Sequence, residues 1–295
     1  MGILDNRGNL RGRNAVVVGG ADGIGRAITL ALAEAEVDVA FCDINAAAVK
    51  TTTAEAQAMG RRTLGEVANA LVSAQLADFY ASAAKFFASV DIVVNVVGGV
   101  YMRPFMEKSL QECADDIQRN YGYVLESVRH AVPLLRKSGR GGSIINFTTI
   151  EAHRAAGGFA VYAGAKAATT NFSRAMAWEL GPDKIRINIV APDTTPSSGN
   201  NNAMPQALHD MNADIPPEWW VKAMNMYIPL QAPPSADDLA NTVLYLASDL
   251  AKSITGQVMH CDGGTAAALG MMRWPEDGGI TLPVPMGNTM RKLFG

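Results

Sequence analysis

The chain has 295 residues and a mass of 31.2 kDa, a length that suits one large α/β domain or two small domains. Its 48% hydrophobic and 18% charged residues are ordinary for a globular protein with a substantial core. A net charge of −3 and a pI near 5.8 argue against nucleic acid or an anionic membrane as the main partner.

The composition also argues against secretion, membrane insertion and metal binding. The three cysteines are too few and too scattered for a disulfide framework or a metal cluster, and the histidines lack metal-ligand spacing. Residues 1–14 lack the apolar core of a signal peptide, and no uncharged apolar run reaches the length of a membrane span. We therefore expect a cytoplasmic protein without a metal.

The first predicted elements form a strand, a glycine-rich turn and a helix. Residues 15–18 are an apolar run typical of a strand buried on both faces, and residues 26–34 have a helical pattern. In this context the glycines between them let the backbone approach a diphosphate at the helix N-terminus. A tight turn without a ligand is the alternative. The residues predicted to bind a cofactor here are Gly19, Asp22, Gly23, Ile24 and Gly25.

Asp43 follows the second predicted strand, residues 37–41. A carboxylate at this place can accept from both hydroxyls of the adenosine ribose, and it would repel a 2′-phosphate. It could also cap the helix that begins near Asn45, a role compatible with the first. Because no arginine follows directly, we expect NAD rather than NADP.

The middle of the chain continues the alternation, with helices predicted over residues 47–59 and 72–89 and strands over residues 61–67 and 91–97. Asn95 is a polar residue inside an apolar strand, so its side chain must be paired, and we expect it to tie neighbouring strands together. Gly98 then makes room beside the cofactor. A long helical region over residues 109–137, with a possible break near Gly122 or Pro133, carries Asn120.

Tyr162 and Lys166 lie one turn apart on the next predicted helix, which ends at Leu180 and follows a strand over residues 143–147. An ammonium below a phenol lowers the phenol's pKa, so that it can exchange a proton near neutral pH. The pair alone is weak evidence, since such pairs usually occur by chance on surfaces. It gains weight only from the motifs around it.

The remaining elements complete an α/β pattern: a strand over residues 184–190, a helix over 235–248 and a strand over 257–262. Alternating strands and helices predict a Rossmann-like, doubly wound parallel sheet in a single domain, with ligands at the carboxyl ends of the strands. Residues 193–235 predict a lid, and the tail over residues 269–295 either folds over a neighbouring subunit or stays loose.

Methionine and aromatic residues in the predicted lid favour an adaptable apolar pocket for a ring compound such as a steroid, a terpenoid or an aromatic alcohol. Core or subunit-interface packing is the alternative for each of them: Met204, Met211, Trp219, Trp220, Met224, Met226 and Tyr227. His153 and Arg154, just past Thr149, either border the pocket entrance or belong to the loop surface.

Over about residues 11–266 the sequence resembles the short-chain dehydrogenase/reductase family. The matching motifs, in order, are Gly19-x-x-x-Gly23-Ile24-Gly25, Asn95-Val96-Val97-Gly98, Asn120, Thr149, Tyr162-x-x-x-Lys166 and Pro192. The resemblance implies transfer of hydride between a nicotinamide and a carbonyl or secondary alcohol. It also implies a homotetramer or homodimer formed through the helices near 109–137 and 162–180.

The resemblance implies a role for each matching residue. Tyr162 is the general acid/base, Lys166 lowers its pKa and holds the nicotinamide ribose, Thr149 hydrogen-bonds the substrate oxygen, and Asn120 positions a water in a proton relay. The backbone from Pro192 to Thr195 faces the nicotinamide carboxamide. Further cofactor contacts are expected at Ile44, Asn69, Ala70, Asn95, Gly98, Thr194 and Thr195.

Five positions depart from the family pattern without removing a proton carrier. Thr149 stands for the usual serine and narrows the pocket by a methyl group, while Asn69 replaces an aspartate yet keeps an oxygen for adenine. The others are Val18 for threonine, Val96 for asparagine and Asp193 for glycine. A carboxylate at residue 193 could cap a helix, bind a polar substrate or tighten the loop.

Three functions follow from these observations. The first is an NAD-dependent alcohol dehydrogenase acting on an apolar cyclic alcohol or ketone. The second is a reductase of 3-oxoacyl thioesters, against which the acidic chain and Asp43 count because its usual coenzyme is NADPH. The third is a catalytically idle NAD-binding scaffold, permitted by the departures and opposed by the intact Tyr162 and Lys166.

Overall fold

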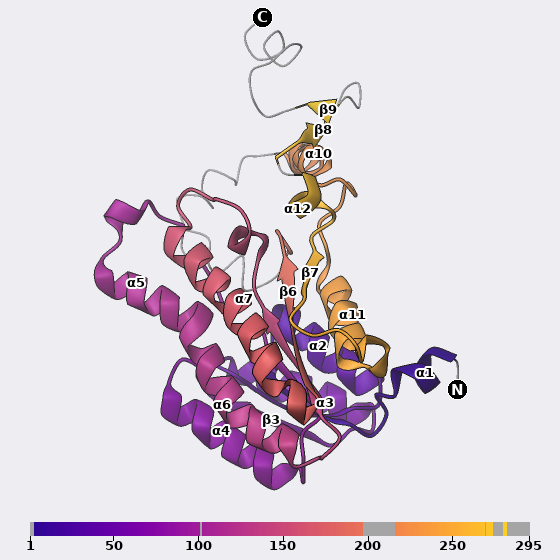
Figure 1. Ribbon diagram of the computed structural model, residues 1–295. Helices are drawn as coiled ribbons and strands as arrows, with labels where there is room; N and C mark the ends of the chain where they lie inside the picture. The colour runs from indigo at the N-terminus through magenta and orange to yellow at the C-terminus, as the bar shows by residue number, and fades with distance from the viewer. Residues whose placement is uncertain (1–2, 101, 197–215, 269, 274–279, 282–295) are drawn as a thin grey trace, which may run out of the picture.

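Seven parallel strands form one sheet in the order β3-β2-β1-β4-β5-β6-β7 (Figure 1). The computed structural model of the protein describes residues 3–100, 102–196, 216–268, 270–273 and 280–281. The strands are β1 (Asn14–Val18), β2 (Asp38–Asp43), β3 (Thr63–Val67), β4 (Ile92–Asn95), β5 (Gly142–Phe147), β6 (Ile185–Pro192) and β7 (Val258–Cys261). The predicted doubly wound parallel sheet is confirmed.

Side chains alternate between two hydrophobic cores because successive residues of a strand point to opposite faces. In β1, Val16 and Val18 belong to one core, and Ala15 and Val17 to the other. Residues of α4 (Ser73–Phe86), α6 (Tyr123–Arg136) and α7 (Ala160–Leu180) complete the first core. Residues of α2 (Gly23–Glu34), α3 (Ala46–Ala58) and α11 (Ala236–Ala247) complete the second, on the opposite face in Figure 1.

The long predicted helical region is interrupted by one wide turn. Helix α5 (Leu110–Ile117) begins with a capping box between Ser109 and Glu112 and runs into a π-helical turn, η2 (Gln118–Gly122), before α6. The predicted break near Gly122 is therefore confirmed, whereas α6 continues through Pro133. A π turn displaces the following residues and is frequent at functional sites.

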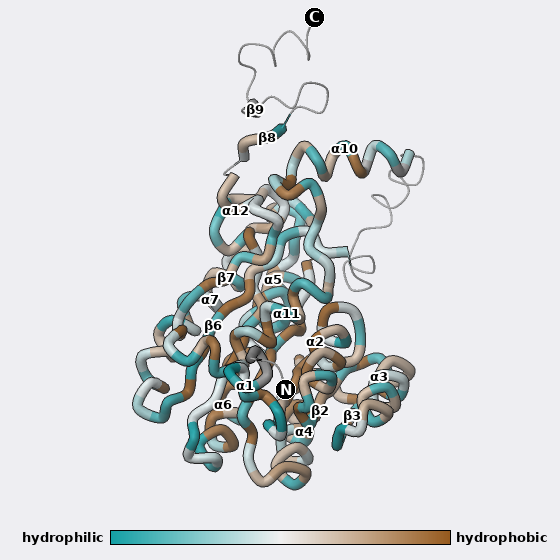
Figure 2. Tube along the Cα trace, turned by 90° about the vertical axis from the view of Figure 1, so that its right-hand side faces the viewer, coloured by the Kyte–Doolittle hydropathy of each residue, from teal (hydrophilic) through white to brown (hydrophobic). Residues whose placement is uncertain are grey.

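A smaller group of elements lies beyond the carboxyl ends of β6 and β7 (Figures 1 and 2). It contains α10 (Pro217–Tyr227), α12 (Thr265–Ala268) and the antiparallel pair β8 (Met272–Arg273) and β9 (Ile280–Thr281). Figure 2 shows mixed hydropathy along α10. The lid predicted for residues 193–235 is thus partly helical, and Met204, His209 and Met211 lie outside the described residues.

Short elements join these layers: α1 (Ile3–Gly8), η1 (Phe105–Glu107), η3 (Ile150–Ala152), η4 (Gly181–Asp183) and η5 (Asp249–Ala251). Within the described residues, no helix is both long and apolar enough to cross a bilayer. The same part of the chain contains no cluster of three potential metal ligands. The three cysteines, Cys42, Cys113 and Cys261, are free thiols.

Candidate active site

The turn between β1 and α2 can adopt its shape only with glycine at two positions. Gly19 has φ of +85°, and a Cβ on Gly25 would lie 1.7 Å from the carbonyl oxygen of Gly19. Asp22 caps α2 by accepting from the N–H of Gly23 at 2.7 Å. The close approach of backbone to the helix N-terminus forms a cradle that fits a diphosphate. The contacts of Gly19, Asp22, Gly23, Ile24 and Gly25 with a cofactor stay predictions.

Asp43 is fixed at the carboxyl end of β2, beside this turn. Its carboxylate accepts from the N–H of Ala21 at 3.1 Å and from that of Asn45 at 3.2 Å. Asn45, not Asp43, is the N-cap of α3, so the capping role considered for Asp43 is wrong. Ile44 is 71% exposed next to it, which leaves an apolar surface available to an adenine ring.

The loop after β3 places Asn69 and Ala70 near the same edge of the sheet. The side-chain oxygen of Asn69 accepts from the N–H of Leu71 at 3.0 Å, and the Asn69 N–H donates to Gln75 at 2.7 Å. A carbonyl oxygen has two lone pairs. The predicted contact of Asn69 with adenine would therefore use the remaining lone pair of this oxygen. Ala70 is buried.

Asn95 ties neighbouring strands together, as predicted. Its side chain is fully buried, donates to the Asn146 side chain of β5 at 2.8 Å and accepts from Ser127 of α6 at 2.5 Å. Asn146 passes the connection on to Ser173 of α7 at 2.9 Å. These bonds fix β4 and α7 relative to each other, and a direct contact of Asn95 with the cofactor stays a prediction.

Gly98 is the place where Lys166 and Asn120 meet. A Cβ on Gly98 would lie 2.8 Å from the Lys166 amine and 3.2 Å from the Asn120 side-chain oxygen, so only glycine leaves both groups where they are. The amine of Lys166 donates to the carbonyl of Phe147 at 3.0 Å. The Asn120 amide donates to the carbonyl of Gly99 at 2.9 Å and accepts from its N–H at 3.2 Å.

The π turn explains how Asn120 reaches this point. Asn120 lies within this turn, and its side chain donates to the carbonyl of Asp116 at 2.9 Å. The Asn120 carbonyl in turn accepts from the Thr169 hydroxyl of α7 at 2.8 Å. Asn120 is fully buried and joins the loop after β4, η2 and α7.

The expected lowering of the Tyr162 pKa by Lys166 is wrong for this arrangement. Burial raises the pKa of Tyr162 to about 12, and the charges of Glu151 and Asp193 add to the increase. Burial also lowers the pKa of Lys166 to about 8. The Lys166 amine is directed to the Phe147 carbonyl, so each group is governed by the loss of water around it.

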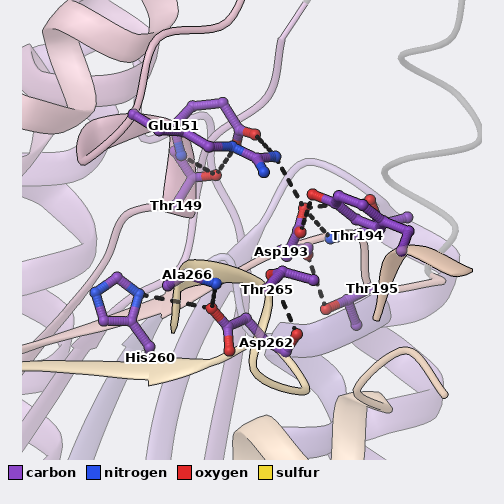
Figure 3. A network of polar contacts seen from close by, with 11 residues as sticks. Thr149, Glu151, Asp193, Thr194, Thr195, His260, Asp262, Thr265 and Ala266 are labelled. Carbon is purple, nitrogen blue, oxygen red and sulfur yellow. Dashed lines mark hydrogen bonds and ion pairs between the residues drawn. The ribbon is translucent and has the colours of Figure 1, made fainter. Parts of the chain in front are cut away.

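A chain of polar contacts that the sequence did not predict begins at Thr149 (Figure 3). The hydroxyl of Thr149 donates to the carboxylate of Glu151, which also accepts from Arg154 at 2.7 Å. Arg154 lies 3.8 Å from the carboxylate of Asp193, and the Tyr227 hydroxyl donates to the same carboxylate. These contacts join η3 and the residues just after it, the loop after β6, and α10.

This network corrects the interpretation of several residues. Arg154 is exposed, yet it pairs with Glu151 and Asp193, and Tyr227 presents its hydroxyl to a carboxylate instead of lining a purely apolar pocket. Asp193 accepts from the N–H of Thr194 at 2.7 Å, which tightens the loop after β6. The sequence did not single out Glu151. The signal that could have found it is an acidic side chain two positions after the predicted catalytic hydroxyl.

The loop after β6 places Pro192 at the end of the strand, Thr194 at the surface and Thr195 in the interior. The Thr195 hydroxyl donates to the carbonyl of Asp193 at 3.2 Å. Their contacts with a nicotinamide carboxamide stay predictions. In the lower part of Figure 3, Asp262 accepts from the N–H group of Ala266, and also from that of Gly264, both at 2.8 Å.

The sequence was compared with protein families and known proteins. Residues 19–266 match a family model described as enoyl-(acyl carrier protein) reductase. An uncharacterised oxidoreductase of Mycobacterium tuberculosis is 33% identical over 274 residues, which cover 92% of this chain and 95% of that protein. The 3-oxoacyl-[acyl-carrier-protein] reductase of Chlamydia trachomatis is 32% identical over 267 residues, 88% of this chain and 99% of that protein.

The fold was also compared with solved structures. A 7α-hydroxysteroid dehydrogenase complexed with NADH and 7-oxo glycochenodeoxycholic acid superposes with a TM-score of 0.78. It is 28% identical and covers 90% of this chain and 98% of its own. The similarity therefore extends over the whole sheet and the helices that cover it.

Proposed function

The chain belongs to the short-chain dehydrogenase/reductase family, and from that premise we propose that it interconverts a secondary alcohol and a ketone with NAD. One observation carries the proposal: Lys166 and Asn120 converge on Gly98 near the glycine-rich turn, and Thr149 lies close enough to Tyr162 to act on the pKa of its phenol, which it lowers against the larger effect of burial. A proton-exchanging phenol, a second hydroxyl and an amine are thereby gathered at the carboxyl edge of the sheet.

Each of these residues has a task in the proposed reaction. The nicotinamide, when bound, supplies or takes up hydride at the substrate carbon. Tyr162 and Thr149 hold the substrate oxygen, where a proton must move as the carbon is oxidised or reduced. Lys166 is positioned to hold the nicotinamide ribose, and Gly98 keeps the space for it. Asn120 fixes the loop after β4 and would position a relay water.

The proposed coenzyme is NAD because a carboxylate stands at the end of β2. Asp43 is held by two backbone N–H groups and would repel a 2′-phosphate. We expect Asp43→Ala to weaken NAD binding about tenfold and to relax discrimination against NADP. Titration of both coenzymes by quenching of tryptophan fluorescence tests this, and an unchanged ratio of the two dissociation constants would assign coenzyme choice to another residue.

The proposed substrate is a cyclic alcohol or ketone. The described part of the lid offers Met224 and Met226 for apolar contact, while Tyr227, Arg154 and Asp193 add a polar wall. The solved hydroxysteroid dehydrogenase carries a ring compound of this kind together with NADH. A substrate with an apolar ring system and a polar substituent suits this combination of side chains.

A second candidate is a reductase of 3-oxoacyl thioesters. Its support is the 32% identity to the reductase from Chlamydia trachomatis over 99% of that protein. A panel of steroids, terpenols, polyols and acyl thioesters, assayed by nicotinamide absorbance with NAD and NADP, separates the two readings. Absence of turnover across the panel with both coenzymes would favour the third candidate, an idle NAD-binding scaffold.

Tyr162→Phe tests the catalytic assignment. The variant keeps the ring and removes the hydroxyl that exchanges the proton, so we expect turnover to fall at least 1,000-fold, within the range assigned to general acid–base groups, while NAD binding stays nearly unchanged. The measurement is kcat for the best substrate of the panel together with the dissociation constant of NAD. Retained turnover would remove the proposed acid/base.

We further propose that the protein is cytoplasmic. We also propose that it forms a homotetramer or homodimer, because α5 and α7 expose large apolar side chains: Leu110 (86% exposed), Ile117 (46%) and Trp178 (88%). An exposed apolar patch on helices marks an association surface.

A further inference from the structure

Asp116 of α5 makes two contacts that lead in opposite directions. Its carboxylate, which is 5% exposed, forms an ion pair with the amine of Lys108, which is 6% exposed. Its backbone carbonyl accepts from the side-chain amide of Asn120 at 2.9 Å. One buried residue thus connects Lys108, which directly follows η1, with an amide that is assigned to the proposed reaction.

The same amide of Asn120 holds the start of the loop after β4. It donates to the carbonyl of Gly99 at 2.9 Å, and its oxygen accepts from the Gly99 N–H at 3.2 Å. A side-chain amide has two N–H donors, and the carbonyls of Gly99 and Asp116 account for both. The loop is therefore fixed at Gly99 through Asn120 and at Lys108 through Asp116.

Little apolar packing holds the described part of the loop between these two points. A cavity of about 590 Å³ is lined by loop residues between 102 and 108 and by helix residues between 112 and 119, and apart from Met102 and Pro104 its lining is charged. The side chains of Phe105 and Met106 are 54% and 88% exposed. Because close packing is what normally fixes a segment in place, the position of this loop depends on its polar anchors.

A buried ion pair contributes more to geometry than to stability. The loss of water around an ammonium and a carboxylate offsets much of their attraction, so apolar side chains of similar volume often stabilise a fold as well or better. Hydrogen bonds between charged groups are directional, whereas the hydrophobic effect is not. The pair between Lys108 and Asp116 therefore suits a place where one arrangement of the chain has to be selected.

We propose that Lys108 and Asp116 are positioning residues, whose ion pair sets the place of the Asn120 amide beside Gly98 and the Lys166 amine. A Cβ on Gly98 would lie 2.8 Å from that amine and 3.2 Å from the Asn120 oxygen, so a small shift of the amide changes the space around the amine. The effect on turnover rests on the proposed function. The effect on the loop rests on the hydrogen bonds alone.

The test removes both charges at once. Lys108→Met combined with Asp116→Leu deletes the ion pair without leaving a buried charge unpaired, so we expect a melting temperature within about two degrees of the wild type. Each single substitution leaves one buried charge without its partner and should lower the melting temperature by about 10 degrees. Differential scanning fluorimetry measures all three variants.

The positioning role is measured in the double variant, because its stability is retained. Hydrogen–deuterium exchange, resolved to single residues by fragmentation, follows the Gly99 amide that donates to Asn120. We expect this amide to exchange about tenfold faster, as for the loss of one hydrogen bond. The kcat for the best substrate of the panel should fall at least tenfold, since a displacement of about 1 Å can cost about 100-fold. The dissociation constant of NAD should stay nearly unchanged, because Asp43 and the glycine-rich turn are intact.

Arg103→Met is the matched control. The Arg103 side chain pairs with Glu112 at 2.7 Å and so joins the same loop to the same helix, but the two side chains are 49% and 45% exposed. An exposed ion pair contributes little, and the Arg103 N–H keeps its bond to the Gly158 carbonyl at 3.1 Å. This variant should keep the wild-type kcat and Gly99 exchange. An equal acceleration of Gly99 exchange in Arg103→Met would overturn the assignment to the buried pair.

The remaining outcomes also decide the proposal. A stable double variant with the wild-type kcat would overturn it, whether or not Gly99 exchanges faster, because the pair would then have no part in the reaction. If the double variant unfolds, Lys108→Met combined with Asp116→Met places unbranched, adaptable side chains at both positions and is measured in the same way. If the wild type turns over no compound of the panel, the proposed function fails, and Gly99 exchange alone decides whether the pair positions Asn120.

Discussion

Lys166 occupies a position that is unfavourable for its own charge. The side chain is 3% exposed, and burial lowers its pKa to about 8 from an unfolded value near 10.5. The unfolded chain binds more protons between these two values, so this residue makes stability rise with pH from about 8 to 10.5, and below pH 8 the full penalty is present. A residue retained at such a cost is expected to serve a function.

We predict that Lys166→Met is more stable than the wild type at pH 7. Removing the pKa shift of Lys166 raises the free energy of unfolding by about 3 kcal/mol. Losing the hydrogen bond to Phe147 lowers it by about 1 kcal/mol, so the variant should be more stable by about 2 kcal/mol. Urea unfolding of both proteins at pH 7 and pH 10 measures it, and the difference should shrink at the higher pH. A destabilised variant at pH 7 would show that the amine is well accommodated when charged.

The residues of the site could be predicted from the sequence, but their protonation could not. Spacing named Tyr162 and Lys166, and the resemblance to the family added Thr149 and Asn120; the structure brings Lys166 close to Asn120 and Tyr162 close to Thr149. The direction of the Tyr162 pKa shift depends on burial and on Glu151. Neither is visible in the sequence pattern. Thr149 and Glu151 meet only because Thr149 caps a 3₁₀ turn.

At the scale of elements, Gly25 and Gly98 have different neighbours, so alanine at the two positions should have different effects on stability and activity. A Cβ on Gly25 would meet backbone, the Gly19 carbonyl at 1.7 Å, whereas a Cβ on Gly98 would meet the flexible end of Lys166 at 2.8 Å. Backbone in a tight turn cannot yield without reshaping the turn. A side-chain amine can move, at the expense of its hydrogen bonds.

We therefore predict opposite outcomes for two alanine substitutions. Gly25→Ala should lower thermal stability by several degrees and abolish NAD binding. Gly98→Ala should keep its melting temperature within about two degrees of the wild type and lose at least tenfold in kcat, because the amine is displaced. Differential scanning fluorimetry with and without NAD, together with kcat, separates them. Equal destabilisation of the two variants would contradict the steric argument.

Elements with strong periodicity were predicted well, and those set by local chemistry were not. The strands of the sheet lie where apolar runs predicted them, within a few residues. Helix α10 was not predicted inside the lid, although Pro217 and Glu218 at its start are common first-turn residues. The π turn at Asn120 has no simple sequence signal.

At the scale of the whole molecule, the exposed tryptophan of α7 predicts an assembly. Trp178→Asp places a charge on the surface expected to pair with another subunit, so it should shift the protein to a smaller species. Light scattering after size-exclusion chromatography measures the mass. Trp219→Asp is the matched control, because Trp219 is 60% exposed on α10 and lies outside α5 and α7. A wild-type monomer, or equal masses for wild type and Trp178→Asp, would refute this surface.

The strand order has a consequence for how the chain is made. The first four strands in the sequence, β1 to β4, are neighbours in the sheet, so residues 14–95 can pair as soon as they leave the ribosome. Yet Val17 and Ile28 share a hydrophobic core with Leu239 and Val243 of α11, which emerges about 150 residues later. At roughly 5–20 residues per second, that apolar face stays bare for about 8–30 seconds. Nascent chains stalled before α11 should therefore be the form that chaperones retain and that aggregates first.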